Sequence, residues 1–294
     1  MLFMAVSIVP LDRLDLVSAR HGRISNETCS PSRSMAGVKA ERVTFEGSDG
    51  QRLAARLDAP DEEASAYALF AHCFTCGKDV FAAARIAQRL TEHGVAVLRF
   101  DFTGLGASEG EFANTNFSSN VDDLVAAAAH LRGAYKAPAL MIGHSLGGTA
   151  VLAAALEVPE AKAVVTIAAP SDPAHVAGLF GDHVPDIEAQ GEAEVLLAGR
   201  RFTIKRQFLR DVAEQNLASK VARLRRALLV MHSPSDTTVD IANATRIFTA
   251  AKHPKSFVGL EHADHLLSER AHAVYAANVI AAWAEPYAWR KAAG

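Results

Sequence analysis

From residue 42 onward, apolar runs of strand length alternate with segments of helical periodicity, and this alternation restricts the chain to a few folds. Six apolar runs have the length of buried strands: 66–71, 95–100, 139–142, 163–168, 227–231 and 256–260. Helical spacing is present at 80–93, 116–131, 146–156, 241–251 and 265–283. Strands that are apolar on both faces and are followed by helices predict an α/β protein, whose mostly parallel sheet is covered on both sides.

Two segments in front of these runs have the pattern of a hairpin. Residues 42–46 and 51–58 alternate polar and apolar side chains on either side of Ser48-Asp49-Gly50. We therefore expect an eight-stranded sheet whose first two strands form an antiparallel edge.

A segment of about 55 residues separates the strand that ends near 169 from the strand that starts at 227. That is too long for a plain loop. Within it, 194–197 and 201–204 have the pattern of a small hairpin, and 207–219 has helical spacing. We expect a cap at about 173–222 over the carboxyl edge of the sheet, where open α/β folds bind ligands.

The cap carries an apolar set and a basic set of side chains. The apolar set is expected to line a roof over the sheet edge: Phe180, Leu196, Leu197, Phe202 and Phe208. The basic set is Arg200, Arg201, Lys205, Arg206 and Arg210. A cluster of basic side chains is more often a solvated face than a surface that steers substrate, and we keep the second reading as the alternative.

The first 38 residues lack this patterning. Residues 18–36 are rich in Ser, Arg and Gly without a period, which indicates a flexible arm at 1–38 in front of a domain at 39–290. Met35 lies just before the first patterned segment and is a second possible start. The apolar stretch 1–10 has neither the basic n-region nor the cleavage site of a secretory signal.

The composition argues against several classes of protein. Of the 294 residues, 50% are hydrophobic and 21% are charged, which predicts a folded chain. A net charge of −3 gives no general attraction for nucleic acid, and no apolar run approaches the ~20 residues of a membrane span. Three cysteines are too few for a disulfide framework. We expect a soluble cytoplasmic protein with reduced cysteines and leave its oligomeric state open.

Gly143-His144-Ser145-Leu146-Gly147 matches Gly-x-Ser-x-Gly and joins an expected strand to an expected helix. A turn this sharp needs small residues near the Ser, because its backbone is strained and larger side chains would crowd it. The turn lifts the hydroxyl clear of the sheet and aims the amino terminus of the helix at the same point. Ser145 is therefore the predicted nucleophile, and a hydrogen-bonded Ser in a tight turn is the alternative.

A serine hydroxyl needs a base that accepts its proton, and the imidazole needs a carboxylate that holds its tautomer. His265 lies at the start of the expected last helix, and we prefer it to His262 as the base. Asp236 follows the last strand but one, and we prefer it to Asp172, which follows the strand before.

The oxyanion of an acyl-transfer reaction needs two backbone N–H donors. We expect one from Leu146, the residue after the predicted nucleophile, and the other from Phe74, in the loop after 66–71. Phe74 occupies the place that follows a His-Gly pair in many lipases and esterases, but here Cys73 replaces the Gly.

Cys73 and Cys76 form a Cys-x-x-Cys pair in the same loop. A zinc site would need two further ligands at suitable spacing, and no second pair exists. We expect two thiols that shape the oxyanion loop, and a thiol redox centre is the alternative. The glycine-rich segment 101–108 lacks the Lys of a phosphate-binding loop and is predicted to be a structural loop beneath the site.

The elements from about 40 to 285 resemble the α/β-hydrolase superfamily, in which Ser145, Asp236 and His265 have the usual chain order of the triad. Three segments are similar to a bacterial serine-hydrolase subgroup that is often fused to a downstream OsmC-like peroxiredox domain: 71–79, 99–106 and 262–267. The resemblance implies an α/β-hydrolase fold and an esterase activity that uses neither a cofactor nor a metal.

Together, these features predict a carboxylesterase that acts through an acyl-enzyme on small to medium acyl esters. The expected substrate is a small molecule, with no nucleic-acid partner and no membrane span. Thioester hydrolysis, amide hydrolysis and peracid formation suit the same triad and stay open. Two further alternatives are a thiol redox protein that uses Cys73 and Cys76, and a binding module without turnover.

Overall fold

The computed structural model describes residues 38–73, 76–197 and 199–289. The arm expected at 1–38 lies outside these residues except for Val38, which begins the first strand. Met35, the second possible start, and Phe74, the expected oxyanion donor, lie outside them as well.

Eight strands form one sheet in the order β1-β2-β4-β3-β5-β6-β9-β10. They are β1 (Val38–Glu46), β2 (Arg52–Pro60), β3 (Ala66–Ala71), β4 (Val95–Phe100), β5 (Leu140–His144), β6 (Ala163–Ile167), β9 (Ala227–His232) and β10 (Lys255–Gly259). Strand β2 is antiparallel to both β1 and β4, and the other neighbouring strands are parallel. The predicted eight-stranded, mostly parallel sheet with an antiparallel edge is confirmed.

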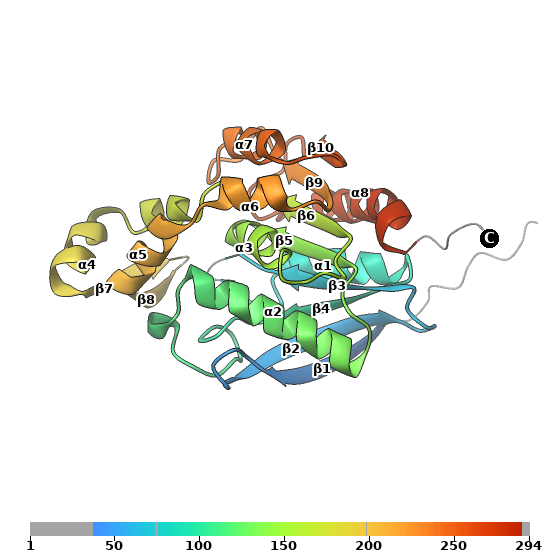
Figure 1. Ribbon diagram of the computed structural model, residues 1–294, viewed down its shortest axis with the longest axis horizontal. Helices are drawn as coiled ribbons and strands as arrows, with labels where there is room; N and C mark the ends of the chain where they lie inside the picture. The colour runs from blue at the N-terminus through green and yellow to red at the C-terminus, as the bar shows by residue number, and fades with distance from the viewer. Residues whose placement is uncertain (1–37, 74–75, 198, 290–294) are drawn as a thin grey trace, which may run out of the picture. The chain divides into compact units, whose positions relative to one another are not determined.

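Helices cover both faces of the sheet, as the sequence predicts. On one face α1 (Phe81–Thr91) packs against α8 (Arg270–Ala288). The other face carries α2 (Phe117–Ala134), α3 (Leu146–Ala154), α6 (Leu217–Arg223) and α7 (Ala242–Ala250). Figure 1 shows α2 in front of the strands. Within the described residues, no helix combines the length and the apolar character that crossing a bilayer requires.

Strand β3 contributes side chains to the hydrophobic cores on both faces of the sheet. Its successive side chains point to opposite faces of the sheet. Ala68 and Phe70 belong to the core beneath α1 and α8, whereas Leu69 and Ala71 belong to the core beneath α2 and α3. All four are buried, which explains why this strand is a continuous apolar run.

Before α6, the chain that follows β6 forms several short elements in the range where a cap was expected. They are two 3-10 helices (Pro173–Leu179 and Gly181–His183), α4 (Val184–Gln190), β7 (Glu192–Leu197), β8 (Arg200–Lys205) and α5 (Arg206–Glu214). Figure 1 shows α4, α5 and the β7–β8 hairpin gathered together beside the sheet.

Two predicted helices differ from the observed ones. The helix expected at 207–219 is divided into α5 and α6, because Gln215 is extended and Asn216 leaves the helical region to cap α6 with its side chain. The helix expected at 265–283 begins only at Arg270, because Leu267 adopts a left-handed backbone with a φ of 49°. His265 therefore lies in a loop and not on the helix.

Candidate active site

Ser145 lies on the sharp turn between β5 and α3, with a φ of 54° and a ψ of −129°. A side chain other than glycine rarely adopts this region, and residues held there are often functional. Two hydrogen bonds fix the turn: the Ser145 amide donates to the Ile167 carbonyl over 2.8 Å, and the Gly148 amide donates to the Ser145 carbonyl over 2.8 Å.

The two glycines that flank Ser145 in the motif are required by packing. A Cβ atom on Gly143 would lie 2.3 Å from the Gly147 carbonyl oxygen. A Cβ atom on Gly147 would lie 2.3 Å from the carbonyl oxygen of His72, at the end of β3. The first turn of α3 therefore lies directly against the chain that leaves β3, and any larger residue would separate them.

Ser145, His265 and Asp236 form one chain of hydrogen bonds. His265 Nε2 lies 3.0 Å from Ser145 Oγ, and His265 Nδ1 lies 2.8 Å from Asp236 Oδ2. They follow β5, β10 and β9, whose carboxyl ends meet at one edge of the parallel sheet. The structure thus brings together three side chains that the sequence predicts as a set.

Asp236 is held as a carboxylate by several donors. Its side chain is fully buried, and Oδ1 accepts hydrogen bonds from the amides of Thr238 and Val239 over 2.8 and 2.9 Å. Burial by itself would raise the pKa of Asp236, but the hydrogen bonds from His265, Val239 and Thr238 outweigh it and keep the pKa below its ordinary value. The negative charge opposite His265 Nδ1 is therefore a stable feature of the site.

The alternative residues have other partners. Asp172 is exposed and caps a 3-10 helix by accepting from the Ala174 amide over 2.9 Å. Asp264, the carboxylate next to His265 in the sequence, accepts from the amide and the hydroxyl of Ser268 over 2.8 and 2.6 Å. His262 is exposed, with a φ of 62°. These contacts favour Asp236 and His265 over their rivals.

Two buried imidazoles that the sequence reasoning did not single out hold the loops of the site. His144 Nε2 donates to the backbone carbonyl of His265 over 2.7 Å, and His232 Nε2 donates to the carbonyl of Val239 over 2.8 Å. Burial, followed by the nearby charge of His265, lowers the pKa of His144 to about 4. Their positions at the last residues of β5 and β9 were the available signal.

Of the two expected oxyanion donors, the structure describes Leu146. Leu146 is the first residue of α3, and the first N–H groups of a helix have no acceptor within it. Its amide is therefore in the place where the residue after a nucleophile supplies a donor. Phe74 lies outside the described residues.

Asp101, which follows β4, binds the loop that follows β3. The buried Asp101 carboxylate accepts from the Lys78 amide over 2.6 Å, from Lys78 Nζ over 2.7 Å and from the Ala107 amide over 3.0 Å. Burial would raise the pKa of Asp101, yet the hydrogen bonds from Lys78 and Ala107 hold it below its ordinary value. The segment 101–108 thus has the structural position that its sequence predicts.

Cys73 and Cys76 differ from the expectation of two thiols, since the structure joins them in a disulfide with Cα atoms 5.3 Å apart. A Cys-x-x-Cys loop brings its two ends close enough for this bond, which a count of cysteines cannot reveal. Cys73 is buried, and Cys76 is partly exposed.

The side chains expected to line a roof differ in burial, and their place over Ser145 stays a prediction. Four of the five predicted roof residues are buried, namely Phe180, Leu197, Phe202 and Phe208. Leu196 was predicted wrongly, because its side chain alternates to the outer face of β7 and is 66% exposed. In the basic cluster, Arg201 pairs with Glu194 and Arg206 with Glu188, as a solvated face would.

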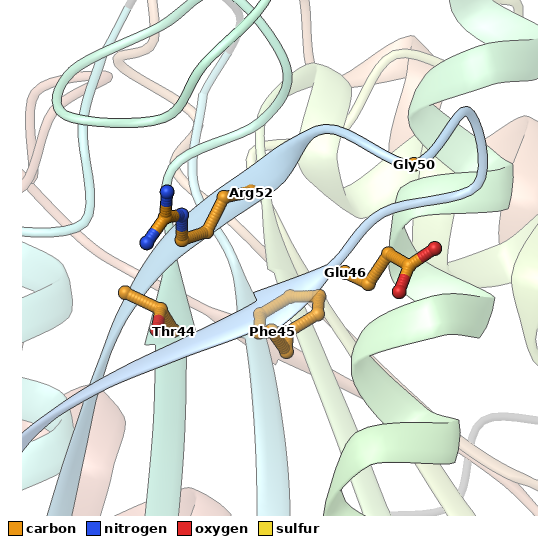
Figure 2. A pocket seen from close by; sticks show the side chains of 5 residues that line it. All are labelled: Thr44, Phe45, Glu46, Gly50 and Arg52. Carbon is orange, nitrogen blue, oxygen red and sulfur yellow. The ribbon is translucent and has the colours of Figure 1, made fainter.

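Two hollows have different relations to the triad. One, of about 10 Å³, is lined by apolar side chains beside Leu146, among them Phe102, Leu105 and Phe117. The other, of about 290 Å³, lies at the β1–β2 hairpin, where Figure 2 shows the Glu46 and Arg52 side chains pointing away from one another. The first hollow adjoins Leu146 and Gly147, next to Ser145, whereas no triad residue is among those that line the second.

Comparison with known proteins gives one family model and several solved structures. The model described as serine aminopeptidase, S33, matches residues 63–194. One similar solved structure is the crystal structure of the esterase domain from a Rhodothermus marinus protein, whose sequence is 52% identical to this chain. The match has a TM-score of 0.71 and covers 85% of this chain and 99% of that one. Est1E from Butyrivibrio proteoclasticus, solved with ferulic acid, is 21% identical with a TM-score of 0.69, over 83% of this chain and 98% of that one. The likeness to Est1E shows the fold alone.

A curated relative has a more specific description. The mitochondrial palmitoyl-protein thioesterase ABHD10 of Rattus norvegicus is 25% identical over 185 residues, which make up 60% of this chain and 61% of the relative. The match therefore spans less than two thirds of that relative's length.

Proposed function

Because this chain belongs to the α/β-hydrolase superfamily, we propose that it is a serine carboxylesterase that works through an acyl-enzyme. One observation carries the proposal: the hydrogen-bonded chain from Ser145 Oγ through His265 to Asp236, with Ser145 on a strained turn at the carboxyl edge of the sheet. The esterase-domain relative from Rhodothermus marinus supports the same activity.

In this mechanism Ser145 Oγ attacks the acyl carbonyl while His265 Nε2 accepts the hydroxyl proton. The Asp236 carboxylate stabilises the imidazolium through Nδ1. The N–H groups of Leu146 and Phe74 donate to the oxyanion of the tetrahedral intermediate. His265 then gives its proton to the leaving alkoxide, and water, activated by the same imidazole, releases the acyl group from Ser145.

The substrates that we propose are esters of small to medium acids. The apolar hollow beside Leu146 has a volume of about 10 Å³, which is room for roughly one water molecule. The hollow adjoins Leu146, the proposed oxyanion donor, and an acyl chain of two to six carbons enters it only if the lining side chains move. We place the enzyme in the cytoplasm, and cell fractionation with an antibody to the chain tests this location.

Thioester hydrolysis is the second candidate, since the curated relative is described as a palmitoyl-protein thioesterase. The same Ser145 and His265 can transfer the acyl group from a thiol as well as from an alcohol. The two candidates differ in the substrate, both in its leaving group and in the length of its acyl chain. Matched acetyl, hexanoyl and palmitoyl esters and thioesters separate them.

Labelling with a fluorophosphonate, together with ester turnover, tests the proposed function. We expect one label per chain, lost in Ser145→Ala. The kcat should fall on the order of 10⁴- to 10⁶-fold in Ser145→Ala, in His265→Ala and in the double variant alike, because residues that act as a unit are not additive. Asp172→Asn is the matched control and should keep its activity. Near-normal ester turnover by Ser145→Ala would refute the proposal.

The segments that resemble hydrolase/OsmC-like fusion proteins belong to the same proposal. We propose that the chain corresponds to the hydrolase part of such a protein. The description of the Rhodothermus marinus relative as an esterase domain of a protein supports this. Joining the chain to an OsmC-like domain and measuring ester and peroxide turnover in the fused and separate forms tests whether the two activities are coupled.

A further inference from the structure

The Cys73–Cys76 disulfide closes a small ring at the start of the loop that follows β3. The two cysteines are three positions apart in the sequence, and a disulfide across so short a ring restricts the unfolded chain less than one across a long loop. Global stability is therefore a weak reason for this bond. Its location beside the proposed oxyanion donors points to a local effect.

Both ends of this ring are held firmly by neighbouring elements. On one side, the His72 carbonyl lies against Gly147 in the first turn of α3, and His72 Nδ1 donates to the Cys73 carbonyl over 2.8 Å. On the other side, Lys78 binds the buried Asp101 through its amide and its ammonium group. The disulfide is a covalent restraint between these two anchored ends.

The two sulfur-bearing residues differ in access to solvent. Cys73 is 6% exposed, whereas Cys76 is partly exposed and lines an open surface cavity of about 450 Å³. Lys78 and Asp101 line the same cavity. A small thiol in this cavity can reach Cys76, and exposed disulfides are the ones that exchange readily.

We propose that Cys73–Cys76 is a thiol–disulfide exchange site that takes a dithiol reductant, and that its redox state sets the rate of ester hydrolysis. One thiolate of the dithiol attacks Cys76 Sγ, the Cys73–Cys76 bond breaks, and Cys73 Sγ leaves with the electron pair and takes up a proton. The second thiolate of the reductant displaces Cys76 Sγ, which is protonated in turn. The dithiol is oxidised to a disulfide, and two electrons pass to the protein.

The expected effect on catalysis follows from what the bond restrains. In the disulfide form, the Cys76 amide also donates to the Cys73 carbonyl over 3.1 Å, and reduction removes the covalent link beside this hydrogen bond. The chain beside Gly147 then gains freedom, and the oxyanion donors are less well placed for Ser145. Reduction should therefore slow ester hydrolysis. A disulfide in a cytosolic protein is usually catalytic or redox-sensing, which agrees with this assignment.

The exchange site is tested first without reference to esterase activity. A Cys29→Ser variant leaves the pair as the two remaining cysteines of the chain. The folded protein is oxidised with glutathione disulfide, treated with dithiothreitol or buffer, alkylated with N-ethylmaleimide and weighed by mass spectrometry. We expect no maleimide on the oxidised protein and two after the dithiol. A pair that reacts fully after the oxidant, or that is reduced only in denaturant, overturns the exchange site.

The second half of the proposal rests on the proposed function, and its test is the kcat of the same samples. Reduction should lower kcat at least threefold, by no more than the roughly 10²- to 10³-fold loss caused by removing one oxyanion donor, and reoxidation should restore it. The Cys73→Ser/Cys76→Ser variant, checked for folding by circular dichroism, should match the reduced enzyme in both buffers. An equal kcat in the two redox states overturns control of the rate. Absent turnover and labelling in every state would refute the esterase, whereas the maleimide result would still decide the exchange site.

Discussion

His144 Nε2 donates a hydrogen bond to the backbone carbonyl of His265 over 2.7 Å, and this bond joins the strand that carries the proposed nucleophile to the loop that carries the proposed base. His144 is the last residue of β5, directly before Ser145. His265 lies in a loop, because α8 begins only at Arg270. Burial lowers the pKa of His144 to about 4, so its ring is neutral near pH 7 and Nε2 carries the proton that the carbonyl accepts.

We expect His144→Phe to slow turnover by releasing the His265 loop. A misplacement of about 1 Å can reduce the rate on the order of 10²-fold, so we expect a loss of kcat up to this size with a smaller change in KM. His144→Gln, whose amide can donate to the same carbonyl, should recover most of the activity. Steady-state kinetics of both variants provide the comparison. An equal loss of kcat in both would show that the hydrogen bond to the His265 carbonyl does not position the loop for catalysis.

The carboxylate partner of His265 distinguishes Asp236 from Asp172. Asp236→Asn removes the charge opposite His265 Nδ1, and the loss in kcat is expected to be on the order of 10⁴-fold. Asp172→Asn changes an exposed cap of a 3-10 helix and should cost less than about 1 kcal/mol of stability with little effect on kcat. Ester kinetics and urea unfolding of both variants provide the measurements. A larger loss of kcat in Asp172→Asn than in Asp236→Asn would make Asp172 the carboxylate partner of His265.

Two glycine substitutions separate packing at the turn from ordinary helix propensity. Gly147→Ala would place a Cβ atom 2.3 Å from the His72 carbonyl, so we expect loss of labelling at Ser145 or loss of folding. Gly133→Ala in α2 meets no atom within 4 Å and should stabilise the protein by about 0.5–1 kcal/mol. Fluorophosphonate labelling and urea unfolding provide the two measurements. A Gly147→Ala enzyme with full activity would contradict the proposed geometry of the turn.

Asp123 should make stability depend on pH. Burial raises its pKa to about 6 from 3.8, although hydrogen bonds from the amide and hydroxyl of Thr103 oppose this. A raised pKa in the folded state favours folding below 3.8, and this contribution is lost as the pH rises through about 6. This difference between the folded and unfolded pKa of Asp123 corresponds to about 3 kcal/mol in the free energy of unfolding.

The matched variants isolate this contribution. Between pH 4 and 7, Asp123→Asn should gain stability relative to the wild type by up to about that amount, because the amide does not ionise. Urea unfolding across this range is the measurement, and Asp182→Asn, at an exposed position in the cap, is the control. A constant difference between Asp123→Asn and wild type would show that Asp123 titrates alike in both states.

Acyl-chain preference should follow the hollow beside Leu146. Acetyl to hexanoyl esters should be better substrates than esters of 12 carbons or more. Leu105→Ala enlarges the hollow and should raise the hexanoyl-to-acetyl ratio of kcat/KM by about 3- to 10-fold, since a buried methylene contributes roughly 0.8 kcal/mol. Leu53→Ala removes a buried leucine from β2, away from the hollow, and should leave the ratio unchanged. A preference of the wild type for long acyl chains would favour the thioesterase candidate.

Local sequence patterns predicted the presence of helices and strands better than the residues at which they begin and end. The strands Ala66–Ala71 and Val95–Phe100 match the expected ranges, because continuous burial on both faces requires an uninterrupted apolar run. Asn116 caps α2 with its side chain, and the expected range of this helix began at the same residue, since capping depends on neighbours within one turn. The start of α8 was predicted wrongly, because the left-handed backbone at Leu267 has no marker in its own side chain.

The α/β alternation and the turn at Ser145 could be predicted from residue types at short spacing, and the order of Ser145, Asp236 and His265 could be read along the chain. Three features could be known from the folded chain alone: the hydrogen bond from His144 to the His265 carbonyl, the Cys73–Cys76 bond and the exposure of Leu196. His144 and His265 are 121 positions apart, so a bond between them depends on the order of the strands and not on any local pattern. The Cys73–Cys76 bond depends on the conformation of its loop, and the exposure of Leu196 depends on which face of β7 packs inward; residue type alone sets neither.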